Sequence, residues 1–571
     1  MGIEGLDLEI EKYVLDNASK YDGKASPGAV IGHVIAAFPD VKSDMKNVSK
    51  KINDKIREIN ALGLDAQKKL IDEKYPELLE EKTHDRSDEL KELDDVDPKK
   101  GVLMRFAPSP SGPMHIGHAI TGGLTSLYVK KYGGKFILRI EDTNSDNIDL
   151  DAYEQLPVDA AWIFGNVSEV WVQSDRMQVY YDYIEKFFDK DAIYVCSCSQ
   201  DEFKEHVLKK ENCPCRDLPT TEHRKRWKKM FDKNHGYKEG DVVVRFKSDM
   251  QHKNPAMRDF PLVRINDSEH PRQGLKYRVW PLMNLCVTVD DIEAGMTHII
   301  RAKDHADNAK RQEMMFQALG LDWFPKTYFV GRYNFEGLEI SCSKTKAKIK
   351  AGEFKGWDDI RVPFLQALKR RGYQPQAFMK YTRLVGISPV DKTVSAEEFF
   401  KTINSFNKEI IDSLSSRFFI LRNPKKIKVE GAPKLNIILD LHPNNHEGGR
   451  NFQTGELFYV EEGDLISFKD GGLYRLMDCL NFKSKGESFV FDSEDYEVYK
   501  EKGKRIVHWL PADADLVKVN VLMPDNSELE CLGEPSLKSL KVGDIIQAER
   551  FGFMRLDKEE DGKFFFWYTH N

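Results

Sequence analysis

The chain has 571 residues, of which 40% are hydrophobic, and its 86 Lys and Arg against 93 Asp and Glu give a net charge of −7. This balance excludes a globally basic nucleic-acid binder, although it allows a local basic groove. No apolar run approaches the roughly 18 residues of a membrane span, and eight cysteines are too few for a disulfide scaffold at this length. We therefore expect a cytoplasmic protein of about four domains, with no membrane partner.

The first stretch of the chain has the pattern of packed helices. Apolar side chains recur at helical spacing, as at Val48, Ile52 and Ile56. Residues 77–100 are dense in charge and end near Pro98, which is typical of a solvated helix end followed by a linker. The sequence thus predicts a helical extension before the main body of the chain.

From residue 101 onward the pattern changes to strands alternating with helices. Such alternation indicates a parallel sheet with right-handed crossover connections. The expected strands are 102–107, 135–140 and 297–301. The helices expected after them are 115–131, 150–163 and 308–319. Residues 194–290 between them are less regular, 364–422 is expected to be mostly helical, and the turn-rich remainder from 426 has the texture of β-barrels.

The most informative segment is the turn between the first predicted strand and its helix, Arg105 to His118, which reads RFAPSPSGPMHIGH. Open α/β sheets bind ligands at such strand ends, and a helix N-terminus suits phosphates. His115 and His118 are three positions apart and can reach one ligand together, while Gly117 lets a planar base approach the backbone. The alternative is a pair of surface histidines beside a permissive glycine.

These residues reproduce the HIGH signature of class I aminoacyl-tRNA synthetases, and RFAPSPSG closely resembles the glutamyl branch of that class. The glutaminyl branch carries Glu where this chain has Ser109, and Asn-Gly where it has Ser111-Gly112. A second segment, Leu338 to Lys344, resembles the mobile KMSK loop of archaeal-type glutamyl enzymes. Ser341 replaces the first lysine of that signature, and the last two residues match.

The chain is thus identified as a member of the archaeal-type glutamyl-tRNA synthetases. The resemblance implies a multidomain α/β protein with a Rossmann-like class I synthetase catalytic core, an insertion, helical amino-terminal and linker domains, and carboxyl-terminal β-barrels. The implied domains are a helical extension (1–98), the first half of the catalytic fold (99–194), an acceptor-stem-binding insertion with a zinc site (195–285), the second half (286–362), a helical connecting domain (363–425) and an anticodon-binding β-barrel region (426–571).

The resemblance also implies the substrate-binding residues. His115, His118 and Lys344 are the expected catalytic residues, and ATP with Mg²⁺ is expected to contact Pro108, His115, Gly117, His118, Ser343 and Lys344. The expected glutamate-binding residues are Arg105, Ala107, Ser109, Glu141, Met283, Asn284 and Arg301.

Glutamate has two carboxylates and an ammonium, so its pocket needs fixed cations and an acceptor. By resemblance, Arg105 and Arg301 bind carboxylate and Glu141 receives the ammonium. The alternative is an internal ion pair such as Arg105 with Glu141. Met283 and Asn284 stand where many relatives have Tyr-Asp, which removes one donor to the side-chain carboxylate and weakens strict selection of glutamate.

Four cysteines form two Cys-x-Cys pairs, Cys196 and Cys198 followed by Cys213 and Cys215. Four thiolates from two tight turns suit a tetrahedral, structural Zn²⁺. Some relatives carry zinc in this region, and the alternative is free or partly buried thiols.

Two kinds of segment are candidates for tRNA contact. The run 223–229 is basic and lies in the insertion that relatives use to hold the acceptor stem, although it is also compatible with a solvated helix. Arg505–Trp509 and Arg550–Met554 place aromatic residues among charges, where anticodon bases could stack, although such aromatics are also typical of a core.

The predicted function is ATP-dependent attachment of glutamate to tRNA through glutamyl-adenylate, with glutamate, ATP and tRNA(Glu) as partners. The sequence leaves open whether tRNA(Gln) is also charged. The alternatives are a glutaminyl-tRNA synthetase, a non-catalytic tRNA-binding relative, and a different adenylyl transferase that shares the HIGH turn.

Overall fold

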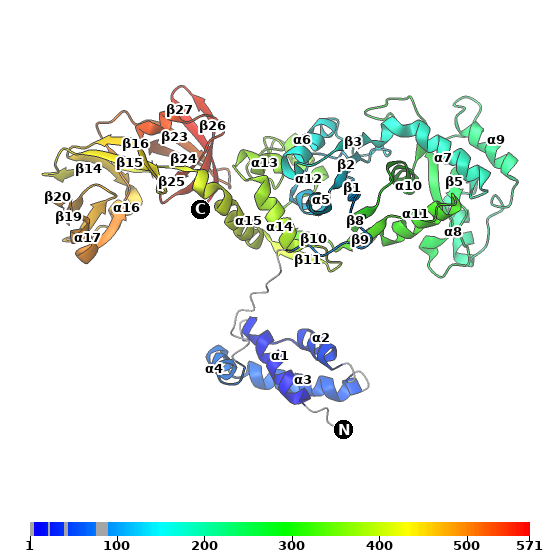
Figure 1. Ribbon diagram of the computed structural model, residues 1–571, viewed down its shortest axis with the longest axis horizontal. Helices are drawn as coiled ribbons and strands as arrows, with labels where there is room; N and C mark the ends of the chain where they lie inside the picture. The colour runs from blue at the N-terminus through cyan, green and yellow to red at the C-terminus, as the bar shows by residue number, and fades with distance from the viewer. Residues whose placement is uncertain (1–4, 21–22, 39–40, 42–43, 76–88) are drawn as a thin grey trace. The chain divides into compact units, whose positions relative to one another are not determined.

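The computed structural model describes residues 5–20, 23–38, 41, 44–75 and 89–571. The chain divides into two compact units, Met1–Glu89 and Leu90–Asn571 (Figure 1). No helix among the described residues has the length and apolar character that crossing a membrane requires.

The described part of the first unit is helical, as the spacing of its apolar residues predicts. Its helices are α1 (Leu6–Lys20), α2 (Pro27–Ala37), α3 (Met45–Asn60) and α4 (Leu64–Lys74). Val48, Ile52, Ile56 and Ile59 form the buried face of α3, and they join a core built from this unit alone. The charge-dense stretch predicted to be a helix end and linker lies partly outside the described residues, at 76–88.

The second unit is built around a parallel sheet. Strands β1 (Val102–Phe106), β2 (Gly134–Ile140) and β3 (Glu169–Val172) pair in parallel, as do β8 (His298–Ala302) and β9 (Lys326–Val330). A hydrogen bond of 3.0 Å from Thr297 N–H to the Leu103 carbonyl brings the two sets together.

The crossover helices α5 (Ile116–Tyr132) and α6 (Ala152–Phe164) lie beside strands β1 to β3 (Figure 1). Strands β1 and β2 are apolar along most of their length and largely buried, as expected of strands covered by helices, whereas β3 is partly exposed. Leu93 belongs to the core of this unit, and Leu90 and Val96 pack against it. Residues 90–98, which we assigned to the extension, therefore lie with the catalytic fold; the other domain boundaries stay predictions.

The insertion is an antiparallel sheet with helices. Its strands run in the order β4 (Ile193–Cys196), β5 (Val243–Phe246), β6 (Phe260–Ile265) and β7 (Val279–Pro281). The helices of this part of the chain are α7 (Met177–Asp189), α8 (Gln200–Lys209), α9 (Thr220–Met230), α10 (Met283–Ala294) and α11 (Ala306–Ala318). Helices α10 and α11 return the chain to the parallel sheet.

A connecting region follows, with α12 (Cys342–Lys350), α13 (Leu365–Arg370), α14 (Pro375–Val385) and α15 (Ala396–Ile411). Strand β10 (Tyr333–Glu336) pairs in parallel with β11 (Lys392–Ser395). The expectation of mostly helix over 364–422 holds for α13 to α15, but β11, β12 (Ser416–Phe418) and β13 (Ile420–Arg422) also fall in this range. Short apolar runs such as Phe418 to Leu421 cannot be assigned to strand or helix by periodicity alone.

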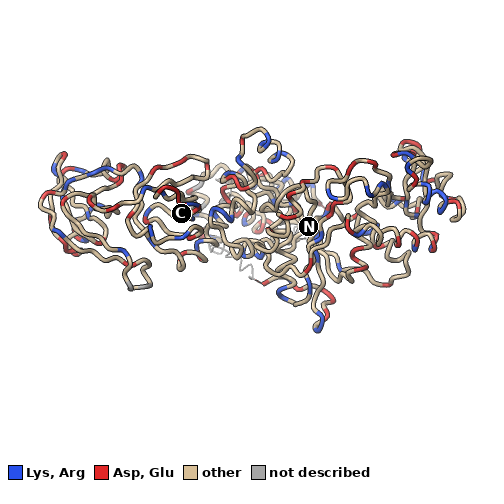
Figure 2. Tube along the Cα trace, turned by 90° about the horizontal axis from the view of Figure 1, so that it is seen from above, with Lys and Arg blue, Asp and Glu red and all other residues tan. Residues whose placement is uncertain are grey.

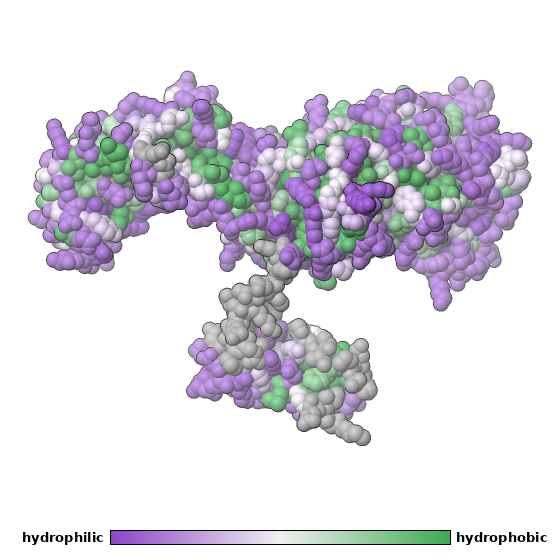
Figure 3. Space-filling model, viewed as in Figure 1, coloured by the Kyte–Doolittle hydropathy of each residue, from purple (hydrophilic) through white to green (hydrophobic). Residues whose placement is uncertain are grey.

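The remaining residues, together with β12 and β13, form two seven-stranded sheets, each a near-barrel with its own apolar core, as the sequence predicts, and one separate two-stranded sheet. The strands are β14 (Pro424–Glu430), β15 (Asn436–His442), β16 (Asn445–Gln453), β17 (Leu457–Glu461), β18 (Leu473–Leu476), β19 (Asn481–Lys485), β20 (Ser488–Ser493), β21 (Gly503–Val507), β22 (Leu510–Pro511), β23 (Val517–Leu522), β24 (Glu528–Gly533), β25 (Ile545–Ala548), β26 (Gly552–Glu560) and β27 (Lys563–His570). Two short helices, α16 (Glu462–Ile466) and α17 (Tyr496–Lys502), accompany them. Figure 3 shows hydrophilic residues (purple) with hydrophobic residues (green) between them on the visible face of Leu90–Asn571.

Candidate active site

The two motif histidines lie at the N-terminus of α5, directly after the turn that leaves β1. His115 is the N-cap, and its Nδ1 accepts the Gly117 N–H at 3.1 Å. The Nδ1 of His118 accepts the His115 N–H at 3.4 Å, and the two rings stack with centroids 3.8 Å apart. The imidazoles therefore lie on one face, as their spacing predicts.

These contacts determine which nitrogen carries the proton in each neutral ring. Because each Nδ1 accepts a backbone N–H, the proton of the neutral imidazole is on Nε2. Burial lowers the pKa of His118 to about 4 and holds the pKa of His115 well below its ordinary value. Near neutral pH both side chains are uncharged and carry Nε2–H donors beside a helix N-terminus, which suits phosphate oxygens.

The turn before these histidines is held by neighbouring segments. The Ile116 N–H donates to the Pro363 carbonyl at 3.2 Å, and the Leu365 N–H donates to the Met114 carbonyl at 2.9 Å. A Cβ on Gly117 would lie 2.9 Å from the His115 ring, so only glycine leaves room for that ring. The turn thus has a fixed shape before any ligand arrives.

The remaining predicted residues of this turn lie at the end of β1. The Pro108 carbonyl accepts the Glu141 N–H at 3.0 Å, which joins the ends of β1 and β2. Ala107 is half-buried and Ser109 is exposed. The structure therefore brings Glu141 next to the turn.

The second motif packs against the same turn, but part of it is helical. Ser341 is the N-cap of α12, so Ser343 and Lys344 lie in the first turn of a helix rather than in the mobile loop that we expected. A Cβ on Gly112 would lie 3.2 Å from the Sγ of Cys342. Lys344 is 72% exposed, and its Nζ lies 3.3 Å from Glu339. Such a surface pair is weak, so the ammonium is available to a charged ligand.

A buried cluster of charges lies where β1 and β2 end. Arg105 donates to Asp291 through Nε at 3.2 Å, and Arg139 donates to the same carboxylate at 2.6 Å. Arg139 also donates to Glu141 at 3.1 Å. Among the described residues, Arg105 thus pairs with Asp291 and not with Glu141, the partner that we considered. Although burial opposes it, the two arginines lower the pKa of Asp291.

Arg301 stands out in this cluster because the side chain that accepts its hydrogen bond is a neutral amide. Its Nη1 donates to the Gln312 Oε1 at 2.8 Å, and within the described residues its buried Nε has no hydrogen-bond partner. Burial and then the charge of Arg105 lower its pKa to about 10. The guanidinium is still charged near neutral pH, and such a group favours an anionic ligand.

Gln312 connects Arg301 to the two residues that depart from the family pattern. Its Nε2 donates to the Asn284 Oδ1 at 3.3 Å and contacts the Met283 sulfur at 3.8 Å. Gln312 is itself buried on α11. The predicted residues Met283, Asn284 and Arg301 are therefore brought together.

Sequence analysis missed three members of this site: Arg139, Asp291 and Gln312. Adjacent acids in an apolar helix were a usable signal for Asp291, because buried carboxylates need cationic partners. Gln312 gave no comparable signal, since helical spacing shows that a position is buried but not what it contacts.

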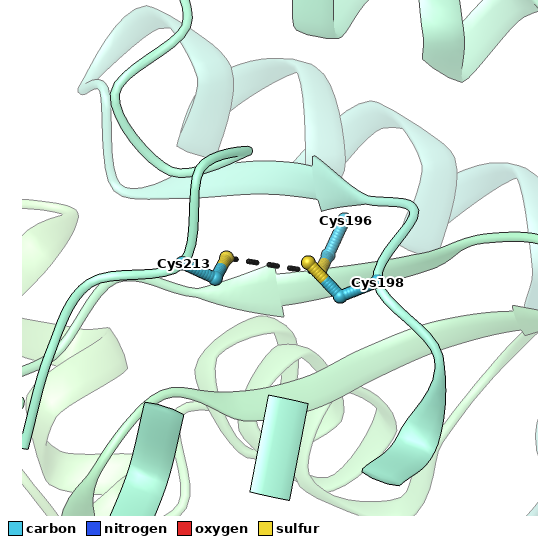
Figure 4. A group of neighbouring side chains, drawn as sticks. All are labelled: Cys196, Cys198 and Cys213. Atoms are coloured by element: carbon cyan, nitrogen blue, oxygen red, sulfur yellow. Dashed lines mark hydrogen bonds between the residues drawn. The ribbon is translucent and has the colours of Figure 1, made fainter. Parts of the chain in front are cut away.

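The four predicted metal-ligating cysteines meet in the insertion, and Figure 4 shows three of them. The Sγ atoms of Cys196, Cys198 and Cys213 all lie within 4.8 Å of one another. Cys213 is 3.8 Å from Cys196, and Cys215 is 4.0 Å from Cys198. A tetrahedron of sulfurs around zinc has edges of about 3.8 Å, so these spacings fit that metal. The Ser197 N–H donates to Cys215 at 3.3 Å, a contact that favours a thiolate.

The predicted tRNA-contacting segments are largely occupied by contacts within the protein. On α9, Arg224 pairs with Glu185 and Asp189, while Arg226 pairs with Glu222. Lys and Arg (blue) are interspersed with Asp and Glu (red) along the coloured trace in Figure 2.

The aromatic residues of the two carboxyl-terminal segments are buried. Trp509, Phe551 and Phe553 belong to the interior of the near-barrels. These rings therefore serve as core rather than as open stacking surfaces, which is the alternative that we weighed for them.

Comparison with protein families identifies three domains along the chain. Residues 101–413 match the family model described as "tRNA synthetases class I (E and Q), catalytic domain". Residues 415–501 and 506–557 match two anticodon-binding domain models of the same group. The class of protein that this fold and site define is therefore the class I tRNA synthetase.

Similar curated proteins extend over nearly the whole chain. A glutamate–tRNA ligase of Methanococcus maripaludis (strain C5) is 39% identical over 98% of this chain and 99% of its own length. That of Methanocaldococcus jannaschii is 38% identical over 99% of this chain and all of its own, 100%. The chain belongs to the glutamate–tRNA ligase family.

A solved structure was also matched, that of a glutamate tRNA ligase from Elizabethkingia meningosepticum in complex with its amino acid. It is 21% identical, with a TM-score of 0.38, over 55% of this chain and 70% of that one.

Proposed function

We propose that this protein attaches glutamate to tRNA at the expense of ATP, through a glutamyl-adenylate. The observation that carries the proposal is Arg301, a half-buried guanidinium held by a neutral amide beside a second arginine, Arg105. A pocket with this excess of positive charge favours an amino acid whose side chain is a carboxylate. The full-length relatives named glutamate–tRNA ligase support the same substrate.

In the first step, a carboxylate oxygen of glutamate attacks the α-phosphorus of ATP. The bond to the bridging oxygen breaks, and pyrophosphate leaves with its electron pair. The Nε2–H groups of His115 and His118 bind the phosphates at the N-terminus of α5, and Lys344 neutralises charge on them. In the second step a hydroxyl of the tRNA 3′-terminal ribose attacks the acyl carbon, and AMP leaves.

The pocket residues have separate tasks. Arg301 binds the side-chain carboxylate, and Arg105, already paired with Asp291, adds positive charge beside it. Glu141 receives the substrate ammonium, with Arg139 holding the carboxylate of Glu141 in place. Met283 offers no phenol, so discrimination against the amide of glutamine depends on Arg301. Pro108, Ala107, Gly117, Ser109 and Ser343 complete the proposed contacts.

Two further partners belong to the proposal. Mg²⁺ accompanies ATP, and Zn²⁺ is held by Cys196, Cys198, Cys213 and Cys215 as a structural ion. Such an ion with four protein ligands closes the insertion and takes no part in the chemistry. We place the protein in the cytoplasm, whose reducing conditions keep these thiols available for metal.

Pyrophosphate exchange tests the substrate. With ATP and cognate tRNA present, glutamate is expected to support exchange of label from pyrophosphate into ATP, and glutamine is not. Exchange with glutamine alone would identify a glutaminyl enzyme, and no exchange with either would identify a non-catalytic tRNA-binding relative. Charging of purified tRNA(Glu) and tRNA(Gln) with labelled glutamate then decides whether tRNA(Gln) is also a substrate.

A further inference from the structure

Asp159 is a buried carboxylate that the proposed chemistry does not use. It lies on α6 and is only 4% exposed, and its Oδ2 accepts the Met114 N–H at 2.9 Å. No ion pair among the described ranges of the chain includes this carboxylate, so it is taken out of water for a backbone contact. Burying a charge in this way costs folding stability, and carboxylates kept at such a cost are often functional.

The residue that Asp159 holds is part of the nucleotide turn. Met114 comes directly before His115, the N-cap of α5. Its N–H is held by Asp159, and its carbonyl accepts the Leu365 N–H at 2.9 Å. The backbone at Met114, which determines the position of the His115 ring, is therefore hydrogen-bonded to α6 through its N–H and to the start of α13 through its carbonyl.

We propose that Asp159 is a positioning residue for adenylate formation, whose ionised carboxylate holds Met114 and, through it, the two histidines in the orientation that binds ATP. This inference rests on the function proposed above. A carboxylate binds an N–H about twice as strongly as a neutral acceptor does. Loss of its charge is therefore expected to loosen the turn without removing it.

Asp159 borders a cavity of about 490 Å³ between α6, α13 and the carboxyl-terminal near-barrel. Lys369 is the cation that acts on it, and the Lys369 ammonium lies 5.7 Å from the centre of the Trp162 ring. The other charged or titratable groups around the cavity are Asp358, Arg370, Tyr373 and Arg555. Arg370 is already paired with Asp358 and Asp557, which leaves Lys369 as the main charge partner of Asp159.

Burial raises the pKa of Asp159 to about 7, although the Met114 N–H and Lys369 act in the opposite direction. Because the folded pKa lies above the ordinary aspartate pKa of 3.8, ionisation costs stability, and the cost appears as pH rises from the unfolded to the folded pKa. As the pH rises toward the folded pKa, the Asp159 carboxylate becomes charged and accepts the Met114 N–H as an anion. Activity is thus expected to rise with pH while this residue's contribution to stability falls.

The test is Asp159→Asn, which keeps an acceptor for Met114 but cannot ionise. The ratio of wild-type to variant kcat/KM for ATP in tRNA-dependent pyrophosphate exchange is expected to rise from near one at about pH 6 to roughly tenfold at about pH 8. At the higher pH the unfolding midpoint of the variant is expected to equal or exceed that of wild type. The control is Glu154→Gln on the same helix, an exposed carboxylate, for which the ratio is expected to stay near one.

A second variant keeps the proposal testable if Asp159→Asn fails to fold. Lys369→Met changes an exposed side chain and is expected to move the midpoint of the activity profile to higher pH, because it removes the cation that favours the charged carboxylate.

Three results would overturn the proposal: a ratio that does not vary with pH, an activity loss that follows a lowered unfolding midpoint, or an unmoved profile in Lys369→Met. Absence of exchange in the wild-type protein would instead contradict the proposed function itself.

Discussion

The charge state of His118 decides what this side chain can contribute. With its pKa lowered to about 4, the ring is neutral and donates from Nε2 at any pH above about 5. We expect His118→Ala to reduce tRNA-dependent pyrophosphate exchange about 100-fold, while the Kd for tRNA changes little. Because the group does not titrate between about pH 5 and 8, the size of the loss is expected to be constant over that range.

His235→Ala is the matched control, since His235 is an exposed histidine of the insertion. It is expected to leave exchange unchanged. Equal losses of exchange and of tRNA affinity in His118→Ala would argue against a role in binding ATP.

Gln312, the neutral hydrogen-bond partner of Arg301, is a second side chain on which substrate binding is expected to depend. Gln312→Glu would place a carboxylate beside the Arg301 guanidinium. The guanidinium would then pair with this carboxylate instead of with the carboxylate of the substrate. We expect KM for glutamate to rise roughly tenfold with little change in kcat or in KM for ATP. Steady-state exchange kinetics at varied glutamate concentration measure this split.

Gln317→Glu makes the same change on the exposed side of the same helix, α11, and is expected to behave as wild type. If both variants raise KM equally, the effect comes from added negative charge in general rather than from Arg301.

Individual contacts at the site could be predicted only where both partners lie close in sequence. The spacing of His115 and His118 was enough to place both rings on one face. Arg105 and Asp291 are separated by 186 positions, and only the sheet and α10 bring them together. The sequence therefore indicated which side chains carry charge but not how they pair.

At the scale of the element, the two Cys-x-Cys turns meet beside β4 of the insertion. If they hold zinc, metal analysis returns about one zinc per chain. Cys213→Ser is expected to lose the metal and to lower the unfolding midpoint by about 5 °C. Elemental analysis and thermal melts measure the two effects.

Cys479→Ser, at a buried free cysteine of the carboxyl-terminal region, is the control and is expected to keep the zinc. Protein that is folded and free of zinc after purification without chelators would contradict the metal site.

Elements were easiest to predict where turn signals bound an apolar segment. Helices α5 and α6 and strands β1 and β2 lie within a few residues of their expected bounds, because each is an apolar segment between such signals. Helix α12 was missed, since its charged residues show no apolar face and its start depends on the Ser341 cap.

At the scale of the whole molecule, the catalytic fold is attached to the near-barrels by α13. This short helix begins at the residues that pair with the nucleotide turn. At its other end Arg370 binds Asp557 at 2.7 Å through two nitrogens, and Arg371 donates to the Thr569 carbonyl at 2.9 Å. The nucleotide turn and the carboxyl-terminal region are therefore joined through this helix.

The first unit, in contrast, has an apolar core of its own and contributes no residue to the proposed site. Its core draws only on residues between Leu6 and Tyr75, whereas every residue that we place in the site lies in Leu90–Asn571. Since each unit buries its own apolar side chains, a fragment beginning at Leu90 is expected to fold alone. Its rate of tRNA-dependent pyrophosphate exchange is expected to stay within about twofold of the full chain, with an unchanged midpoint for its own unfolding.

Circular dichroism melts and pyrophosphate exchange on the fragment and the full chain measure both expectations. A fragment that folds but no longer forms adenylate would show that the first unit completes the site. A fragment that does not fold would show that the cores are coupled, because a unit with a self-sufficient core does not need the other to bury its apolar surface. Full exchange with weakened tRNA charging would assign the first unit to tRNA binding, while leaving the site as described.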